Sequence, residues 1–157
     1  MKQFKFSLNT VLDYKERVEE NEKNILASMR AVMKELMAQL AALQEAYKLH
    51  TEEYVDSTSK GLFPHEVATR LTYLKTIEKK IEQKLQEISR QEARIAKQLE
   101  VVVEATKEKK TIGKLKEKHY EKYVQESLKE QEKLIDEFVT NTRSNPGAGA
   151  IPHGGQS

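Results

Sequence analysis

Four histidines are the side chains in this sequence best suited to metal ligation or proton transfer: His50, His65, His119 and His153. No two of them are four residues apart, and none completes a Glu-x-x-His pair, so no helix would present two ligands to one ion. The chain has no cysteine, which excludes thiolate ligands and disulfides. The sequence therefore predicts no metal and no other cofactor.

Catalytic motifs are also missing from the sequence. It has no P-loop, no GxGxxG and no GxSxG. The acidic residues lie on long charged stretches, and two packed helices would enclose no cavity that could tune a carboxylate pKa. We predict a protein that holds other proteins and is not an enzyme.

A basic cluster lies between residues 107 and 122, and a phosphate backbone could attract such a cluster. Its lysines alternate with glutamates, however, and Glu–Lys neighbours on a helix form a solvated charged face. The net charge of +2 predicts no general attraction to nucleic acid or to membranes. We therefore favour contact with an acidic protein surface and no nucleic-acid partner. The lysines are Lys107, Lys109, Lys110, Lys114, Lys116, Lys118 and Lys122.

Residues 7–57 are predicted to form one long helix. Charged residues make up 33% of the chain and aromatic residues 6%, which is typical of long helices and coiled coils. Ser7 can cap the first turn, and the apolar stripe shifts by one residue at Ile25 and Leu26, as at a heptad break. The stripe before the shift comprises Leu8, Val11, Val18, Ile25, Met29, Val32 and Leu36, and the stripe after it Leu26, Met33, Leu40, Tyr47 and Tyr54.

A second helix is predicted over residues 64–140, after a turn at residues 58–64. Gly61 suits the position after a helix end, and Pro64 suits the first turn of the next helix. Helices joined by a short loop pack antiparallel, so the fold class is all-α, an antiparallel coiled-coil hairpin over residues 1–143. The second-helix seam is Val67, Leu74, Ile81, Ile88, Ile95 and Val102, with Leu71, Leu85 and Leu99 between.

The second helix is expected to be longer than the first. Folding the chain at Gly61 sets Leu8 opposite about Lys114. The part of the second helix beyond Lys114 then overhangs as a single helix roughly 35 Å long. Because tertiary packing supplies most helical stability, this overhang is a candidate docking element; alternatively, it frays or pairs in a dimer. Gly113 lowers the helix propensity here by about 1 kcal/mol relative to Ala.

Two further expectations concern the ends of the chain. The glycine- and proline-rich residues 144–157 cannot bury enough surface to offset their ordering entropy, so a disordered tail is predicted. The N-terminus lacks the apolar core of a signal peptide, and no apolar run approaches the length of a membrane span. We therefore predict a soluble cytoplasmic protein.

Three segments carry a resemblance to a known family. Residues 4–14 read FKFSLNTVLDY, and residues 76–83 read TIEKKIEQ. The third segment comprises Glu108, Lys109, Lys110, Leu115, Lys116, Glu117, Lys118, Gln131, Asp136, Glu137 and Phe138. In these segments, in length and in turn position, residues 4–140 resemble the flagellar FliJ family, which is related to the YscO-type proteins of type III secretion.

The resemblance implies a stalk similar to the coiled coil of the rotary ATPase γ subunit. Such a stalk would insert into the pore of the hexameric flagellar export ATPase (FliI type), promote its assembly and contact the export gate (FlhA type). Family members are also described as escorts of export chaperones. The implied location is cytoplasmic, peripherally associated with the inner membrane at the flagellar base.

Two sets of contact residues follow from the resemblance and the overhang. By analogy with γ, the termini end enters the ATPase ring and the turn faces the gate. The candidate ATPase contacts are Lys109, Lys110, Lys116, Lys118, Asp136, Glu137 and Phe138. The candidate gate contacts are Gln39, Leu43, Tyr47, Tyr73 and Ile77.

Three alternatives remain open at this point. Tyr47 and Tyr54 fit a packed seam as well as a contact surface. The whole chain fits a structural or adaptor coiled coil, dimeric or not, that has no ATPase partner. A nucleic-acid-binding coiled coil is the third reading, and strongly salt-dependent binding would be its signature.

Overall fold

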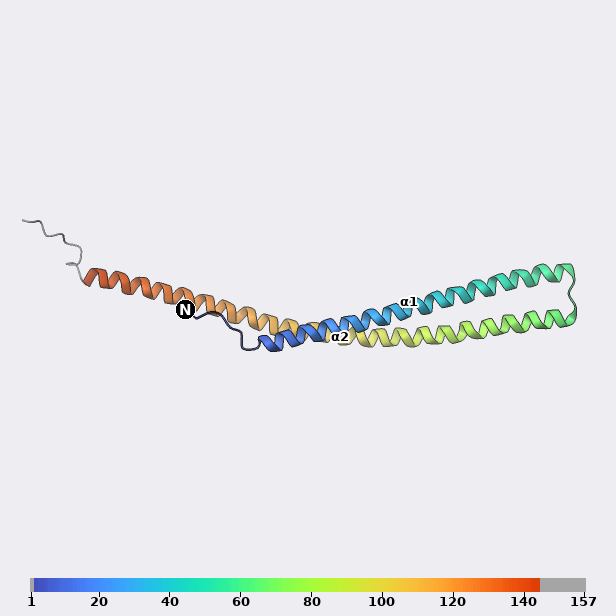
Figure 1. Cartoon of the computed structure of the whole chain (residues 1–157), viewed down its shortest axis with the longest axis horizontal. Coiled ribbons are helices and arrows are strands. Elements are labelled where there is room, and N and C mark those ends of the chain that lie inside the picture. The colour runs from blue at the N-terminus through green and yellow to red at the C-terminus, as the bar shows by residue number, and fades with distance from the viewer. Residues whose placement is uncertain (1, 145–157) are drawn as a thin grey trace, which may run out of the picture. The chain divides into compact units, whose positions relative to one another are not determined.

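The computed structural model describes residues 2–144, and every regular element within them is an α-helix. α1 spans Asn9–Lys60 and α2 spans Pro64–Ser144 (Figure 1). The predicted pair of long helices is confirmed, and both helices end a few residues later than predicted. Of the predicted disordered tail, Ser144 is the last residue of α2, and the remainder lies outside the described residues.

The start of α1 differs from the predicted cap at Ser7. The backbone amide of Leu12 donates to the carbonyl of Leu8 at 2.9 Å, and the amide of Asn9 donates to the carbonyl of Phe6 at 3.1 Å. Leu8 thus occupies the position before the first helical residue. Residues 2–6 precede the helix as a non-helical segment.

The connection between the helices follows the prediction closely. Gly61 has a φ of 87°, a left-handed conformation that glycine adopts without a steric penalty. Pro64 is the first residue of α2. The amide of Phe63 donates to Oε2 of Glu66 at 3.3 Å, while the carbonyl of Phe63 accepts from the Glu66 amide at 3.0 Å. These reciprocal bonds satisfy polar groups at the start of α2.

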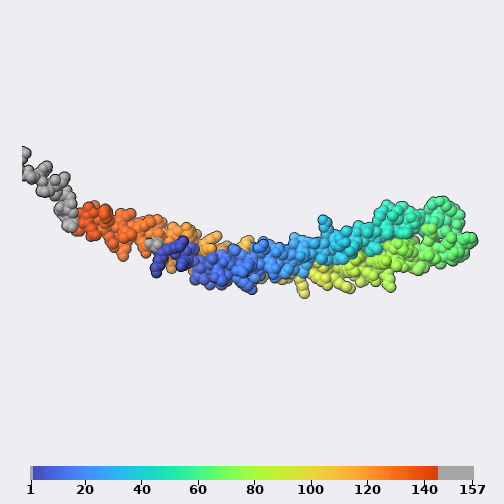
Figure 2. Space-filling model, in the orientation of Figure 1, coloured from blue at the N-terminus to red at the C-terminus, as the bar shows by residue number. Residues whose placement is uncertain are grey.

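The chain divides into two compact units. The hairpin unit comprises Tyr14–Lys109, and the terminal unit comprises Met1–Asp13 with α2 from Lys110 onward. In the hairpin unit, α1 and α2 lie side by side and run antiparallel (Figure 1). In the terminal unit, the N-terminal residues lie on α2, the dark blue and orange parts of Figure 2.

One seam of α2 in the hairpin unit is confirmed, and the other is not. The predicted seam from Val67 to Val102 is buried or half-buried at every seventh residue. Leu71, Leu85 and Leu99 are exposed, because the positions one residue earlier face α1. That second seam consists of Arg70, Ile77, Lys84, Gln91, Gln98 and Ala105.

The predicted heptad break in α1 is wrong. Ile25 and Val32 are exposed, because a single seven-residue repeat runs through the buried face without a shift. The repeat includes a buried carboxylate, which the apolar pattern skipped. Its buried members are Leu12, Glu19, Leu26 and Met33.

Candidate binding surfaces

Two of the predicted ATPase contacts are already paired within the chain. Nζ of Lys109 donates to Oε1 of Glu19 at 2.9 Å in the hairpin unit. Nζ of Lys116 donates to Oδ1 of Asn9 at 3.1 Å in the terminal unit. Both lysine side chains are half-buried. Both bonds join α2 to α1, but only Lys109 is paired with an opposite charge, whereas Lys116 keeps its positive charge beside a neutral amide.

The other predicted ATPase contacts are open to solvent. Lys110 and Lys118 are exposed and form no ion pair with any residue between 2 and 144. Asp136, Glu137 and Phe138 are exposed too, and the Phe138 side chain retains 73% of its accessible surface. These five positions satisfy the accessibility that a contact surface requires.

Glu19 is the centre of a buried ionic cluster in the hairpin unit. It is 6% exposed, and its Oε1 accepts hydrogen bonds from Lys109 at 2.9 Å and from Lys23 at 3.2 Å. The hydrogen bonds from Lys109 and then from Thr106 lower the pKa of Glu19 to about 2 from the usual 4.5. A carboxylate held in this way stays ionised in the seam and orients both lysines.

The non-helical residues 2–6 form what we call the N-terminal strap. The ring of Phe4 meets the rings of Tyr120 at 5.2 Å and Tyr123 at 5.4 Å, measured between centroids. Phe6 is buried against the ring of His119 at 5.5 Å. The predicted overhang therefore begins about two helical turns later than expected, because the strap covers α2 as far as Tyr123.

Beyond the strap, α2 carries exposed apolar side chains on one face. This part of the helix is orange to red in Figure 2. The apolar residues are three, four or seven positions apart and so share one helical face. All of them are exposed, and every residue from 131 to 144 is exposed as well. We call this face the open stripe; it consists of Val124, Leu128, Ile135, Phe138 and Val139.

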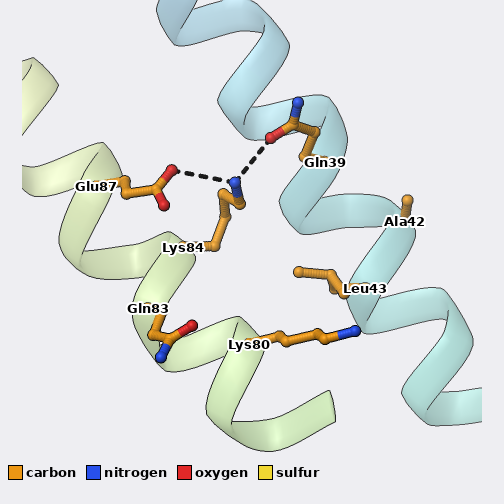
Figure 3. A pocket seen from close by; sticks show the side chains of 7 residues that line it. All are labelled: Gln39, Ala42, Leu43, Lys80, Gln83, Lys84 and Glu87. Carbon is orange, nitrogen blue, oxygen red and sulfur yellow. Dashed lines mark hydrogen bonds and ion pairs between the residues drawn. The ribbon is translucent and has the colours of Figure 1, made fainter. Parts of the chain in front are cut away.

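A groove in the hairpin unit contains two of the predicted gate contacts. It has a volume of about 460 Å³ and opens between α1 and α2 (Figure 3). Leu43 points from α1 towards α2 across it, beside the small side chain of Ala42 (Figure 3). Nζ of Lys84 donates to Oε1 of Gln39 at 2.8 Å and to Oε2 of Glu87 at 3.0 Å. Lys80 and Gln83 complete the lining.

The remaining predicted gate contacts differ in exposure. Ile77 is 3% exposed and packs in the seam, so it does not form part of a surface. Tyr47 is half-buried, and its hydroxyl donates to Oε1 of Glu78 at 2.8 Å, which raises the pKa of Tyr47. Tyr73 is exposed and meets the ring of His50 at 4.6 Å. Tyr73 is therefore the most accessible of the three.

The histidines are not gathered around a common point. His50 lies 3.5 Å from Glu53, His65 stacks on Phe63 at 5.9 Å, and His119 packs on Phe6. The remaining histidine, His153, lies outside the described residues. Within residues 2–144, no group of His, Asp and Glu side chains could hold a metal ion.

The sequence pattern missed the residues that join the helices through polar contacts. Nε2 of Gln91 donates to the carbonyl of Met29 at 2.9 Å, and Nε2 of Gln98 donates to the carbonyl of Glu22 at 3.1 Å. The seven-residue spacing of polar residues could have found them. Gln91 lies seven residues after Lys84 and Gln98 fourteen residues after it, and their acceptors Met29 and Glu22 are also seven residues apart.

The helices of the described part also bear on membrane association. Neither α1 nor α2, as described, contains an apolar stretch long enough to cross a bilayer.

Comparison with known proteins identifies one family. The model of the family described as flagellar FliJ protein matches residues 4–147, which is nearly the whole chain. No curated protein and no solved structure matches the chain significantly.

Proposed function

Because the chain belongs to the flagellar FliJ family, we propose that it is the stalk and escort component of the flagellar type III export apparatus. Family membership implies a function related to flagellar export, and the family is a non-enzymatic export component. The finer proposal is that it binds in the pore of the hexameric export ATPase. There it would promote assembly of the ring and couple the ring to the export gate.

The open stripe is the observation that carries this proposal. Five large apolar side chains on one face of α2 are exposed, and no described residue covers them. Helices in proteins gain most of their stability from tertiary packing. A partner that covers the open stripe would therefore stabilise this part of α2. Apolar anchors at this spacing on one helical face suit an apolar groove on a partner protein.

Charged side chains around the stripe would orient the stalk. Lys118 and Lys110 are exposed without an ion pair to a described residue, and Asp136 and Glu137 directly precede Phe138. Exposed charges of this kind contribute mainly to association rate and to orientation. We propose that six subunits contact this mixed surface unequally and so sense its rotational position.

The groove in the hairpin unit is the proposed gate contact. Leu43 supplies an apolar side chain in it, and Lys80 and Lys84 supply positive charge. Tyr73, exposed on the same unit, is a second candidate contact. Export chaperones are proposed as further clients of the hairpin unit, and association with the inner membrane would be peripheral, through the gate.

The test is a titration of the export ATPase from the same organism with the purified protein. Ring assembly and ATP turnover are measured as the stalk concentration rises. The double variant Lys110→Glu/Lys118→Glu should require at least about fivefold more protein for half-maximal stimulation, because rim charges steer association. The control is Lys48→Glu/Lys97→Glu, which changes two exposed lysines of the hairpin unit by the same charge.

The outcomes separate this proposal from its main alternative. No stimulation by the unaltered protein, with an active ATPase, would reject the stalk. The alternative is a structural or adaptor coiled coil, and the open stripe favours it too, because a second copy could cover the stripe. A dimer in sedimentation equilibrium that dissociates on Phe138→Asp would support that alternative.

A further inference from the structure

Phe63 lies in the short connection at the end of the hairpin unit, directly before Pro64 (Figure 1). It retains 68% of its accessible surface, a larger fraction than any other phenylalanine or tyrosine of the hairpin unit. A phenylalanine, unlike a tyrosine, has no polar atom that water could bind. The ring therefore places apolar surface in solvent at the point where the hairpin ends.

The backbone of Phe63 is held by three hydrogen bonds. Its amide donates to Oε2 of Glu66 at 3.3 Å, and its carbonyl accepts from the amides of Glu66 at 3.0 Å and Val67 at 3.1 Å. The ring stacks on that of His65, with the centroids 5.9 Å apart and the planes 15° apart. A group that is already ordered loses little conformational entropy when it binds. The ring is thus positioned before a partner arrives.

Phe63 occupies a position that favours a different kind of residue. It is the N-cap of α2, because its carbonyl accepts the first hydrogen bond of the helix from Val67. Ser, Thr, Asp and Asn are preferred there, since their side-chain oxygens accept from an amide of the first turn. Glu66 supplies one half of a capping box, which a serine or threonine would complete. The exposed ring supplies no such bond, and departures from a local rule are expected at functional sites.

The charge around the connection indicates which surface the ring can meet. Residues 52–70 contain four acidic and two basic residues, and hence a net charge of −2. Of the two bases, Lys60 lies 3.1 Å from Asp56, and Arg70 is half-buried in the seam. Anionic lipid headgroups and nucleic acid attract basic segments and repel an acidic one. A protein pocket with lysine or arginine at its rim is therefore complementary. The acidic residues are Glu52, Glu53, Asp56 and Glu66.

We propose that Phe63 is the anchor by which the end of the hairpin unit binds an apolar pocket with a basic rim on a partner protein. The identification of this partner with the export gate rests on the proposed function, whereas the role of the ring as an anchor does not. Aromatic side chains that fill a partner's pocket carry a large share of the binding energy of an interface. This contact is separate from the groove, whose lining residues lie on α1 and α2 and not in the connection.

The substitution Phe63→Ser tests whether the ring is kept at the expense of the fold. The hydroxyl can accept from the Glu66 amide, so the urea midpoint of unfolding, followed by circular dichroism, should rise by a few tenths of a molar. Val55→Ser is the matched control, because Val55 is 62% exposed within α1, where a serine caps no helix, and its midpoint should not rise. An unchanged or lower midpoint for Phe63→Ser would overturn the anchor, since the fold would then give no reason to assign the ring to a partner.

Binding to the export gate of the same organism, purified in detergent, tests the partner. Phe63→Ser should bind at least about tenfold more weakly than the unaltered chain. Phe63→Leu should restore part of this loss, and Val55→Ser should bind as the unaltered chain does. The affinity should also fall as the salt concentration rises, because the rim and the connection carry opposite charges. Equal binding by Phe63→Ser, or binding that does not depend on salt, would overturn the proposal.

A tryptophan distinguishes the protein pocket from a lipid surface. The chain has no tryptophan of its own, so the emission of Phe63→Trp reports the surroundings of this position. Vesicles of phosphatidylglycerol should leave the emission unchanged, and a blue shift with them would overturn the protein pocket. Absence of binding to the gate by the unaltered chain would reject the proposed function, and the urea midpoint of Phe63→Ser would then decide on the anchor alone.

Discussion

The hairpin unit and the terminal unit each contain part of α2, and different kinds of side-chain contact hold the rest of each unit to it. In the hairpin unit, amides and charges reach across the seam, as when Gln91 donates to the carbonyl of Met29 at 2.9 Å. In the terminal unit, aromatic rings do most of the covering, as when Phe4 meets Tyr120 and Tyr123. Directional polar contacts fix a register, whereas aromatic pairs accept both offset-stacked and edge-to-face arrangements. The difference assigns a fixed scaffold to one unit and an adjustable surface to the other.

The sharpest test of this comparison removes a buried side chain from the scaffold. Ile77→Ala should lower the free energy of unfolding by about 2–4 kcal/mol, because truncation of a buried isoleucine leaves a cavity. Urea denaturation followed by circular dichroism measures the loss. Leu85→Ala is the matched control, since Leu85 lies on the same helix but is 49% exposed and should change stability by less than about 1 kcal/mol. Equal losses would contradict the observed seam.

The ionic cluster provides the next largest effect. Lys109→Ala should cost about 1–3 kcal/mol, because it removes a hydrogen bond to a buried carboxylate. Exposed Lys97→Ala is the control. A purely apolar scaffold would show no difference between these two variants.

The same cluster predicts a dependence on pH. The pKa of Glu19 is about 2 in the folded chain and 4.5 ordinarily. Its contribution to stability is therefore complete above about pH 4.5 and is lost as the pH falls towards 2. Unfolding measured between about pH 6 and pH 2.5 should show a steeper acid loss for the unaltered chain than for Glu19→Gln. Parallel profiles would show that the cluster does not carry this dependence.

A smaller effect is expected at the glycines. Gly113→Ala should raise the free energy of unfolding by about 1 kcal/mol, because alanine favours helix and the added Cβ meets nothing within 4 Å. Gly61→Ala should have the opposite sign, since its φ of 87° strains any residue with a Cβ. Thermal unfolding of both variants checks the signs. A loss of stability at Gly113 would show that its lack of a side chain serves another purpose.

The smallest expected change in stability is on the open stripe. Phe138→Ala should alter the free energy of unfolding by less than about 0.5 kcal/mol, because Phe138 has no described residue over it. If the proposed function holds, binding of the Phe138→Ala variant to the export ATPase should weaken nonetheless. A large loss of stability with unchanged binding would mean that Phe138 packs within the chain instead.

Periodicity predicted the two helices and their connection, because Gly61, Pro64 and the seven-residue seam from Val67 to Val102 are local signals. It misplaced the second seam. Leu85 looks like a core residue and Lys84 does not, yet the long aliphatic stem of a lysine can lie in a seam while its ammonium group reaches a polar partner. The pattern of apolar residues alone cannot distinguish these neighbours.

The candidate surfaces were less accessible to sequence reasoning. Lys109 and Lys118 look alike in the basic cluster, but only Lys109 lies opposite a buried carboxylate. Whether a lysine is free depends on what the other helix places across from it. The ring contact of Tyr120 likewise depends on Phe4, which is more than a hundred residues away in the sequence, and no local pattern connects them.

The short connection at Gly61 also governs the order in which the contacts form. Near it, the hydrogen bond from Tyr47 to Glu78 joins residues 31 apart, whereas the bond from Tyr123 to Lys2 joins residues 121 apart. Each doubling of loop length adds about 0.6 kcal/mol to the entropic cost of closing the loop. Contacts that have already formed near the connection shorten the loop that the next contact must close. Folding should therefore start at the connection and proceed layer by layer, so that the strap closes last. Until that final step, the chain would lack the contacts of Phe4 with Tyr120 and Tyr123.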